Sequence, residues 1–168
     1  MAGDATPPHL MLKIVSEKEG NIVMKIPQYV SVHEVQRVCD ELGIRDWTSL
    51  TEPDVSIAEA ERILAEVNVS EIEIKAEIFR QGLEVELEHG TRFSDANVTN
   101  NHPLLTGMIV LAHLKESLEY YLRLNVAEIE GDVLKAVVAK APEQFQAKYK
   151  KLSAARRALA QAEAEALL

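Results

Sequence analysis

The sequence predicts a mainly α-helical α+β domain of five to six helices with one β-hairpin at its N-terminal end. Three observations support this fold class. Apolar residues recur at helical spacing from residue 31 onward, two serine capping signals begin such stretches, and two short β-branched runs precede them. At 168 residues one domain is the natural expectation. We divide the chain into a disordered leader over residues 1–8, a helical domain over 9–142 and a long C-terminal helix over 143–168.

The N-terminal hairpin is predicted from two apolar runs at residues 10–15 and 22–26. A polar loop with Gly20 separates the runs, and Pro27 closes the second one. A lone two-stranded hairpin is barely stable in water. We therefore expect it to pack on the helices or on a partner.

Two serine motifs mark the first two helices. Ser31 is followed three residues later by Glu34, and Ser56 by Glu59, which is the capping-box spacing. Gly43 follows the first helical stretch and is expected in the left-handed conformation that ends a helix. The only cysteine of the chain lies on the apolar side of the first helix, so we expect a buried, unreactive thiol.

Four further helices are predicted in the rest of the chain. The glutamate-rich stretch 71–89 favours a helix that Gly90 ends. Residues 104–124 form the strongest helical pattern, and because the first half is apolar all round we expect it to be the most buried element. Another helix is expected at 128–140, followed by the alanine-rich helix 143–168.

Composition and charge exclude several classes of function. The formal net charge of −9 disfavours nucleic-acid binding, because phosphate backbones are bound by neutralising Lys and Arg. No apolar run approaches the roughly 20 residues of a membrane span, and no signal-peptide pattern begins the chain. A single cysteine excludes an internal disulfide and fits a reducing compartment, so we expect a cytoplasmic protein.

One series of short motifs is similar to a known family. In chain order they are Gly-Leu-Glu-Val-Glu-Leu-Glu-His-Gly at 82–90, Asn-Val-Thr-Asn at 97–100, Thr106-Gly107, His-Leu-Lys-Glu at 113–116 and Tyr120-Tyr121. Over residues 72–125 the chain resembles the uncharacterised domain of unknown function 5661, which occurs in bacteria and phages. Met108 departs from the pattern, since a lysine is expected there. The resemblance implies no activity, cofactor or partner.

Common catalytic and nucleotide-binding motifs are absent. The sequence contains no GxGxxG or GxxxxGK[ST] loop, no GxSxG elbow and no HExxH. This absence leaves the polar residues of the predicted helices as candidate sites.

Two carboxylate and imidazole pairs remain. Glu86 and His89 are three residues apart on one predicted helix, and His113 and Glu116 on the next, so the members of each pair share a helix face. If the four side chains converge, they form a candidate site for iron, manganese or zinc, with Tyr120 as an outer hydrogen-bond partner. The alternative, which we favour, is a polar network between packed helices. In either case Gly82, one turn before Glu86, would permit a close helix approach.

The C-terminal helix carries candidate interaction residues. Phe145, Leu152 and Leu159 recur every seven residues, with Tyr149 on the adjacent row, which is the pattern of a narrow helix-pairing seam. The seam predicts a contact with another protein subunit, a second copy or the chain's own body. We therefore expect a non-catalytic interaction protein, an accessory subunit or assembly factor of a larger complex. The alternative is a metal-binding helical protein resembling an oxidoreductase.

Overall fold

The computed structural model describes residues 30–167 as a mainly helical protein. Its elements are α1 (Val32–Leu42), the 3₁₀ helix η1 (Trp47–Ser49), α2 (Ile57–Val67), α3 (Ala76–Arg92), α4 (Pro103–Glu116), α5 (Tyr120–Val138) and α6 (Pro142–Glu165). Six α-helices agree with the predicted number, and residues 30–167 contain no strand. The predicted leader and β-hairpin lie outside the described residues.

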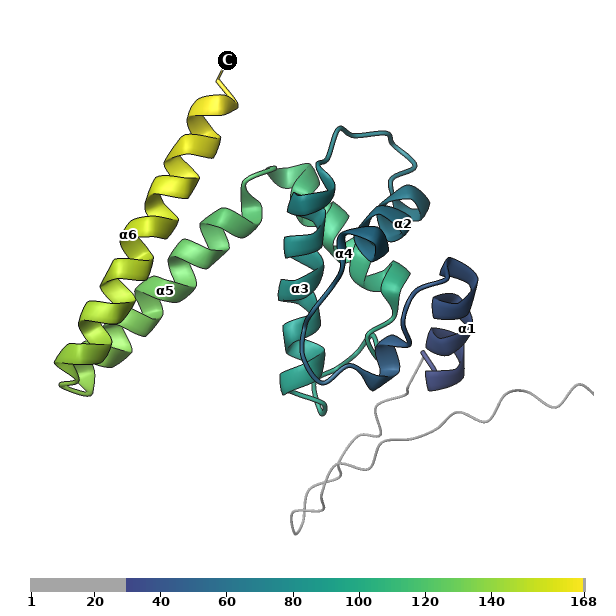
Figure 1. Cartoon of the computed structure of the whole chain (residues 1–168), viewed down its shortest axis with the longest axis horizontal. Coiled ribbons are helices and arrows are strands. Elements are labelled where there is room, and N and C mark those ends of the chain that lie inside the picture. The colour runs from purple at the N-terminus through teal and green to yellow at the C-terminus, as the bar shows by residue number, and fades with distance from the viewer. Residues whose placement is uncertain (1–29, 168) are drawn as a thin grey trace, which may run out of the picture.

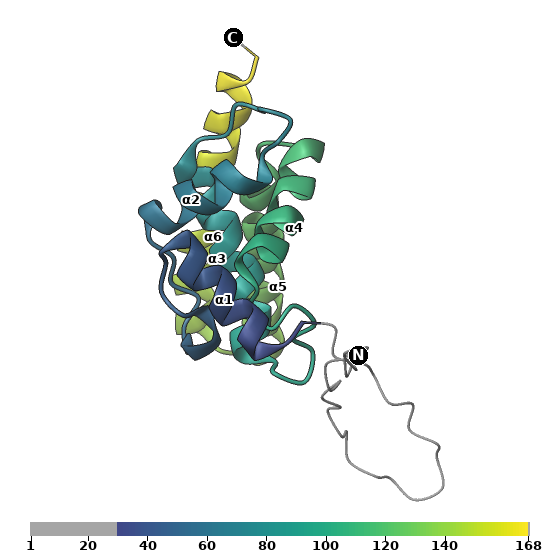
Figure 2. The same cartoon turned by 90° about the vertical axis from the view of Figure 1, so that its right-hand side faces the viewer.

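The helices form two regions of different build. Helices α1 to α4 and the start of α5 make up the body, residues 30–125, whereas the rest of α5 and α6 form an antiparallel pair that leans away from it (Figure 1). We call this helical pair, residues 126–165, the hairpin; it is distinct from the β-hairpin predicted at the N-terminal end. Viewed from the side, α1 and α2 lie in front of α3, and the hairpin lies behind it (Figure 2). Among residues 30–167 no helix is both long and apolar enough to cross a membrane.

Two glycines allow the helices of the body to pack closely against one another. A Cβ atom on Gly82 of α3 would lie 2.5 Å from Val110 Cγ1 of α4 and 2.6 Å from a ring carbon of Tyr121. A Cβ atom on Gly107 of α4 would lie 2.6 Å from Ile63 of α2. Such distances are far below van der Waals contact, so the helices reach their spacing only because these side chains are missing. The close approach predicted at Gly82 is confirmed.

The core around these contacts is aliphatic with a few large aromatic side chains. Trp47, Phe79, Leu83 and Val110 are completely buried. Cys39 is also buried, and burial raises the pKa of its thiol. A thiol that resists deprotonation is a poor nucleophile.

Local capping follows the sequence closely in the first two helices. The Ser31 hydroxyl accepts a hydrogen bond from the Glu34 N–H at 3.1 Å, and Gly43 ends α1 at φ 62°. Ser56 and Glu59 form a complete, reciprocal capping box. The Glu34 carboxylate instead receives the Arg37 guanidinium, so only half of the first box forms.

The boundaries of α3 differ from the prediction at both ends. Residues before Ala76 are not helical, and Gly90, expected to end the helix, lies inside it. The reason is tertiary: a Cβ atom on Gly90 would lie 2.0 Å from Asn101 Oδ1 and 2.9 Å from Asn97 Nδ2. This glycine therefore admits the loop that connects α3 to α4.

The predicted helix 104–124 is two helices. The chain turns at Ser117, whose backbone is extended and whose hydroxyl accepts a hydrogen bond from the Glu119 N–H at 3.3 Å. Short polar side chains favour such local bonds over helix continuation. The helix expected at 128–140 is the second half of α5, which runs unbroken through Gly131.

Within residues 30–167, α4 is the helix with the most buried residues, as expected. Its burial is one-sided: Val110, Leu111 and Leu114 lie on the buried face, whereas Met108 on the opposite face is 57% exposed.

The hairpin is held by one apolar seam and two ion pairs. Leu152 and Ala155 of α6 are buried, as is Ala136 of α5, and Leu159 is half-buried. The ion pairs join Asp132 to Lys148 and Glu130 to Arg156, and a third pair joins Arg123, in the body's part of α5, to Glu163 of the hairpin. Since exposed ion pairs contribute at most about 1 kcal/mol each, the seam is the main source of stability.

Candidate functional site

Helices α3, α4 and α5 meet at a cluster of four polar side chains. The Tyr121 hydroxyl donates a hydrogen bond to Glu86 Oε1 at 3.0 Å, and His113 Nε2 lies 3.7 Å from the same oxygen. The Tyr120 ring stacks on the His113 imidazole at a centroid distance of 4.1 Å and an angle of 9°. The structure thus brings together Glu86 and His113, two of the four residues predicted as metal ligands.

The positions of the two tyrosines follow from neighbouring residues. The turn at Ser117 starts α5 beside α3, and the missing side chain of Gly82 leaves room for the Tyr121 ring. Burial, followed by the adjacent Glu86 carboxylate, raises the pKa of the Tyr121 hydroxyl, which stays protonated as the donor. Tyr120 was expected to hydrogen-bond the site, but in the structure it contacts His113 by ring stacking.

His89 and Glu116 are not part of this cluster. His89 is exposed and lines a cleft of about 530 Å³ between α3 and α5, together with residues such as Arg92, Asp132 and Lys135. Glu116 is exposed at the end of α4. Within residues 30–167 no three His, Cys, Asp or Glu side chains gather closely enough to hold a metal ion. The expected convergence of four ligands is therefore not found there, and metal binding stays a prediction from the sequence alone.

The arrangement of Glu86, His113, Tyr120 and Tyr121 suits a structural network. The Glu86 carboxylate is shared by the Tyr121 hydroxyl and the His113 imidazole, and the described residues contain no buried side-chain nitrogen or oxygen without a hydrogen bond. Such networks fix the relative positions of helices. For Glu86 and His113, the geometry therefore fits the alternative predicted from the sequence, a polar network between packed helices.

A second buried polar residue, Glu59, was recognised only as a cap. Arg45 donates to both of its carboxylate oxygens, at 2.9 and 2.8 Å, and the Trp47 indole N–H donates at 3.3 Å. Burial raises the pKa of Glu59, but these bonds and those from Ser56 outweigh burial and lower it to about 2. The carboxylate thus joins α2 to Arg45 and to the start of η1.

His102 also has a position that its sequence context did not indicate. It is buried, and its Nδ1 accepts a hydrogen bond from the Leu105 N–H at 3.3 Å. Burial lowers the pKa of the imidazole. Its role is to cap the N-terminus of α4.

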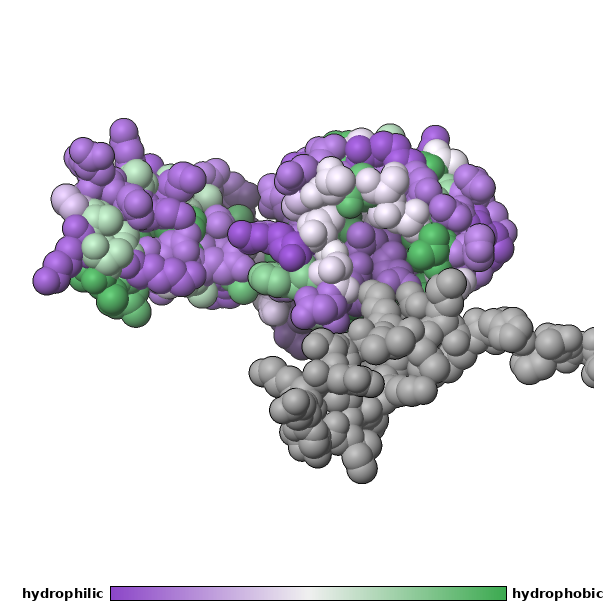
Figure 3. All heavy atoms as spheres, turned by 90° about the horizontal axis from the view of Figure 1, so that it is seen from below, coloured by the Kyte–Doolittle hydropathy of each residue, from purple (hydrophilic) through white to green (hydrophobic). Residues whose placement is uncertain are grey.

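Within residues 30–167 a group of large apolar side chains is exposed where α5 turns into α6. Five large side chains there are exposed by 63, 53, 74, 38 and 52%, namely Leu134, Val137, Val138, Phe145 and Tyr149. We call this set the apolar end of the hairpin. Phe145 and Tyr149 stack at 5.7 Å, and Val137 and Phe145 line the same shallow hollow. Hydrophobic surface is visible at this end in Figure 3.

The predicted interaction residues therefore separate into two groups. Phe145 and Tyr149 are exposed at the apolar end, whereas Leu152 and Leu159 lie in the seam with α5. The α5 residues of the apolar end were missed by sequence reasoning. Their signal is a second apolar row, Leu134, Val137 and Val138, beside the row that contains the buried Ala136.

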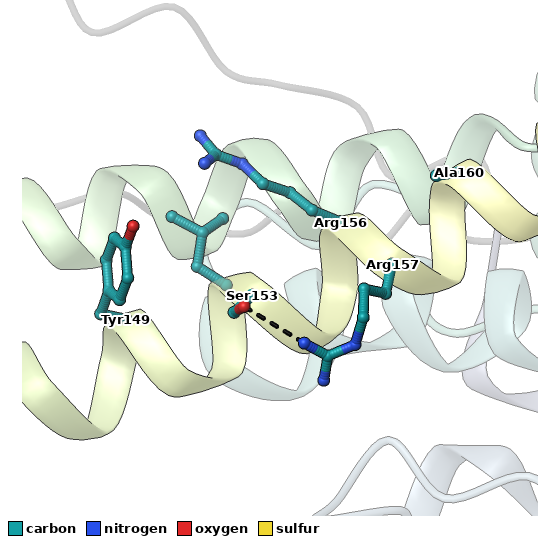
Figure 4. A pocket seen from close by; sticks show the side chains of 6 residues that line it. Tyr149, Ser153, Arg156, Arg157 and Ala160 are labelled. Atoms are coloured by element: carbon teal, nitrogen blue, oxygen red, sulfur yellow. Dashed lines mark hydrogen bonds between the residues drawn. The ribbon is translucent and has the colours of Figure 1, made fainter.

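The surface of α6 beyond the apolar end is basic. Tyr149, Arg156 and Arg157 line a shallow groove of about 260 Å³ (Figure 4). Arg156 pairs with Glu130, and Arg157 donates to the Ser153 hydroxyl at 3.2 Å. Aromatic and arginine side chains in this combination are typical of protein interfaces.

The fold and these surfaces define a helical protein with a compact body and a projecting hairpin. Residues 35–130, more than half of the chain, match the family described as "Protein of unknown function (DUF5661)", so the chain belongs to this family. The match begins in α1 and is wider than the resemblance over 72–125. It ends at Glu130, so the apolar end lies outside it. No curated protein and no solved structure matches the chain.

Proposed function

We propose that this chain is a non-catalytic interaction protein, an accessory subunit or assembly factor, which binds another protein chain through the apolar end of its hairpin. The observation that carries the proposal is the position of five exposed apolar side chains at the end of two helices that project from the body. Large exposed apolar side chains that gather at one end of a molecule mark interaction sites.

The energetics of burial favour such a contact. Covering a large apolar side chain contributes about 1.5–3 kcal/mol. Phe145 and Tyr149 are already stacked on each other, so little side-chain freedom remains to be lost on binding. Aromatic residues in this position are the usual centres of binding energy.

The proposal is tested by the size of the complex in the native cell. A tagged full-length chain is compared with a Phe145→Ala, Tyr149→Ala double variant by native gel electrophoresis and size-exclusion chromatography of lysate. We expect the double variant to migrate at the size of the free chain, with an unchanged circular dichroism spectrum.

A matched control is Phe93→Ala, which removes a 53% exposed phenylalanine from the body instead of the hairpin. This control should keep the size of the wild-type complex. Co-migration of the double variant with the wild type would contradict the proposal.

A further inference from the structure

We propose that the apolar end of the hairpin docks on the outer face of α4 in a second copy of this chain, and that two copies exchange this contact. The inference rests on the proposed function and names its partner. It follows from two apolar surfaces that residues 30–167 leave uncovered and that lie in regions of opposite charge.

The first step concerns the outer face of α4. Leu105, Met108 and Ile109 lie at positions i, i+3 and i+4 and are 37, 57 and 36% exposed. Ala112 extends the same stripe by one turn and is also exposed. A helix that is apolar all round is normally covered on every side, but in the described chain α4 is covered on one. We call these four residues the α4 stripe.

The second step concerns charge. The body, residues 30–125, contains 18 acidic and 8 basic residues, a net charge of −10. The segment 130–157 at the end of the hairpin contains 7 basic residues and 3 acidic residues, a net charge of +4. Lys140, Lys150 and Lys151 of this segment make no ion pair with the described residues. Their charge is therefore available to a partner.

These charges decide between two ways of pairing the apolar surfaces. Contact between two hairpin ends would bring together two segments of charge +4, which repel each other. Contact between a hairpin end and a body brings +4 next to −10, and complementary potentials speed association and fix the orientation of the contact. Charge thus favours the body of the second copy over its hairpin end.

The third step is symmetry. Each chain carries one apolar end and one α4 stripe, so two copies related by a two-fold axis make the same contact twice. Such a closed dimer covers both surfaces and leaves neither available for further growth. One arrangement therefore accounts for both uncovered surfaces.

The test uses the full-length chain and two charged substitutions at exposed positions, Val138→Asp at the apolar end and Met108→Asp on the α4 stripe. Sedimentation velocity over a concentration series should show a wild-type dimer. Each variant alone should dissociate with a dissociation constant raised by roughly tenfold or more. An equimolar mixture of the two variants should form a heterodimer, because one of its two contacts contains only wild-type surfaces.

Two further measurements sharpen the result. Val98→Asp changes an equally exposed valine, 84% accessible, in the loop between α3 and α4, and should leave the dimer intact. Raising the salt concentration from 50 to 500 mM should weaken the wild-type dimer several-fold, because ions screen the attraction between the hairpin and the body.

Three results would overturn the inference: a wild-type monomer at all concentrations, a dimer that Met108→Asp does not affect, or a mixture without heterodimer. A purified wild-type monomer whose complex in lysate still depends on Phe145 and Tyr149 would leave the proposed function standing with a different protein as partner. Insensitivity of the lysate complex to that double variant would refute both.

Discussion

The body and the hairpin are built from the same kind of secondary structure but are held together differently. In the body, helices approach through Gly82 and Gly107, and polar groups such as Glu59 are buried with several partners. In the hairpin, α5 and α6 begin without side-chain caps and share one seam. Close packing and buried polar groups are therefore found mainly in the body. The hairpin has fewer buried contacts and carries the exposed apolar side chains that a partner can bind.

This contrast has a thermodynamic consequence. A region with many buried contacts opens only with the whole domain, whereas a region with few opens locally. We expect the hairpin to exchange its amide hydrogens faster than the body in the free chain. Docking of the apolar end should reduce that difference.

The largest expected effect on stability comes from replacing one buried leucine by aspartate, once in the body and once in the hairpin. Leu111→Asp puts a carboxylate into the body core, where the leucine is 6% exposed. Burying an unpaired charge costs several kcal/mol, which we expect to exceed the stability of the body and unfold it. Leu152→Asp, at a site 3% exposed in the seam, should instead separate α6 from α5 and leave the body folded.

Thermal melting and hydrogen exchange measured on both variants distinguish these outcomes. Cooperative melting of Leu111→Asp near the wild-type temperature would contradict the core assignment. Global unfolding of Leu152→Asp would mean that the hairpin and the body are one cooperative unit.

A smaller effect is expected from acid, and it should act mainly on the body. The pKa of Glu59 is about 2 in the folded chain, below its ordinary value of 4.5. Since the folded pKa is the lower one, this stabilisation is fully present above pH 4.5 and is lost as the pH falls from 4.5 toward 2. A shift of this size corresponds to about 3 kcal/mol.

The measurement is chemical denaturation of the wild type and Glu59→Gln at pH 6 and pH 3. The variant should be less stable at pH 6, and the difference should shrink at pH 3. In the hairpin, Lys148 also lowers the pKa of Asp132, but both groups are solvent-exposed and should contribute little. If the wild type and Glu59→Gln differ in free energy of unfolding by the same amount at pH 6 and at pH 3, the role assigned to the Glu59 carboxylate is wrong.

The smallest effect is a gain in stability of the hairpin. Gly131 lies inside α5, and a Cβ atom there would meet nothing within 4 Å. Glycine in a helix interior costs about 1 kcal/mol relative to alanine. We expect Gly131→Ala to slow hydrogen exchange of α5 and α6 by about fivefold and to leave the body unchanged.

Gly82→Ala serves as the opposite control, because its Cβ atom would overlap Val110 and Tyr121 and should destabilise the body. If Gly131→Ala stabilises the hairpin but weakens dimer formation, the missing side chain belongs to an interface. If it destabilises the hairpin, the helix assignment through residue 131 is wrong.

Features that depend on residues within one helical turn could be predicted from the amino-acid sequence. The caps at Ser31 and Ser56, the left-handed end at Gly43 and the helical character of residues 30–167 all follow from hydrogen bonds and periodicities over three to four positions. Membership of the family was also indicated by its short motifs in order. Even the close approach at Gly82 could be anticipated, because a missing side chain on a helix face has few other uses.

The tertiary structure alone decided which of two locally acceptable alternatives was realised. Gly90 suits both the end and the interior of a helix, and the incoming Asn97 and Asn101 placed it inside. The sequence pairs Glu86 with His89 on one helix, but the turn at Ser117 and the stacked Tyr120 accompany a fold in which His113 lies beside Glu86 instead. The repeat of Phe145, Leu152 and Leu159 looks uniform along the chain, yet α5 ends near Phe145 and covers only the other two. Such outcomes depend on contacts between residues far apart in sequence, whose energies no local pattern contains.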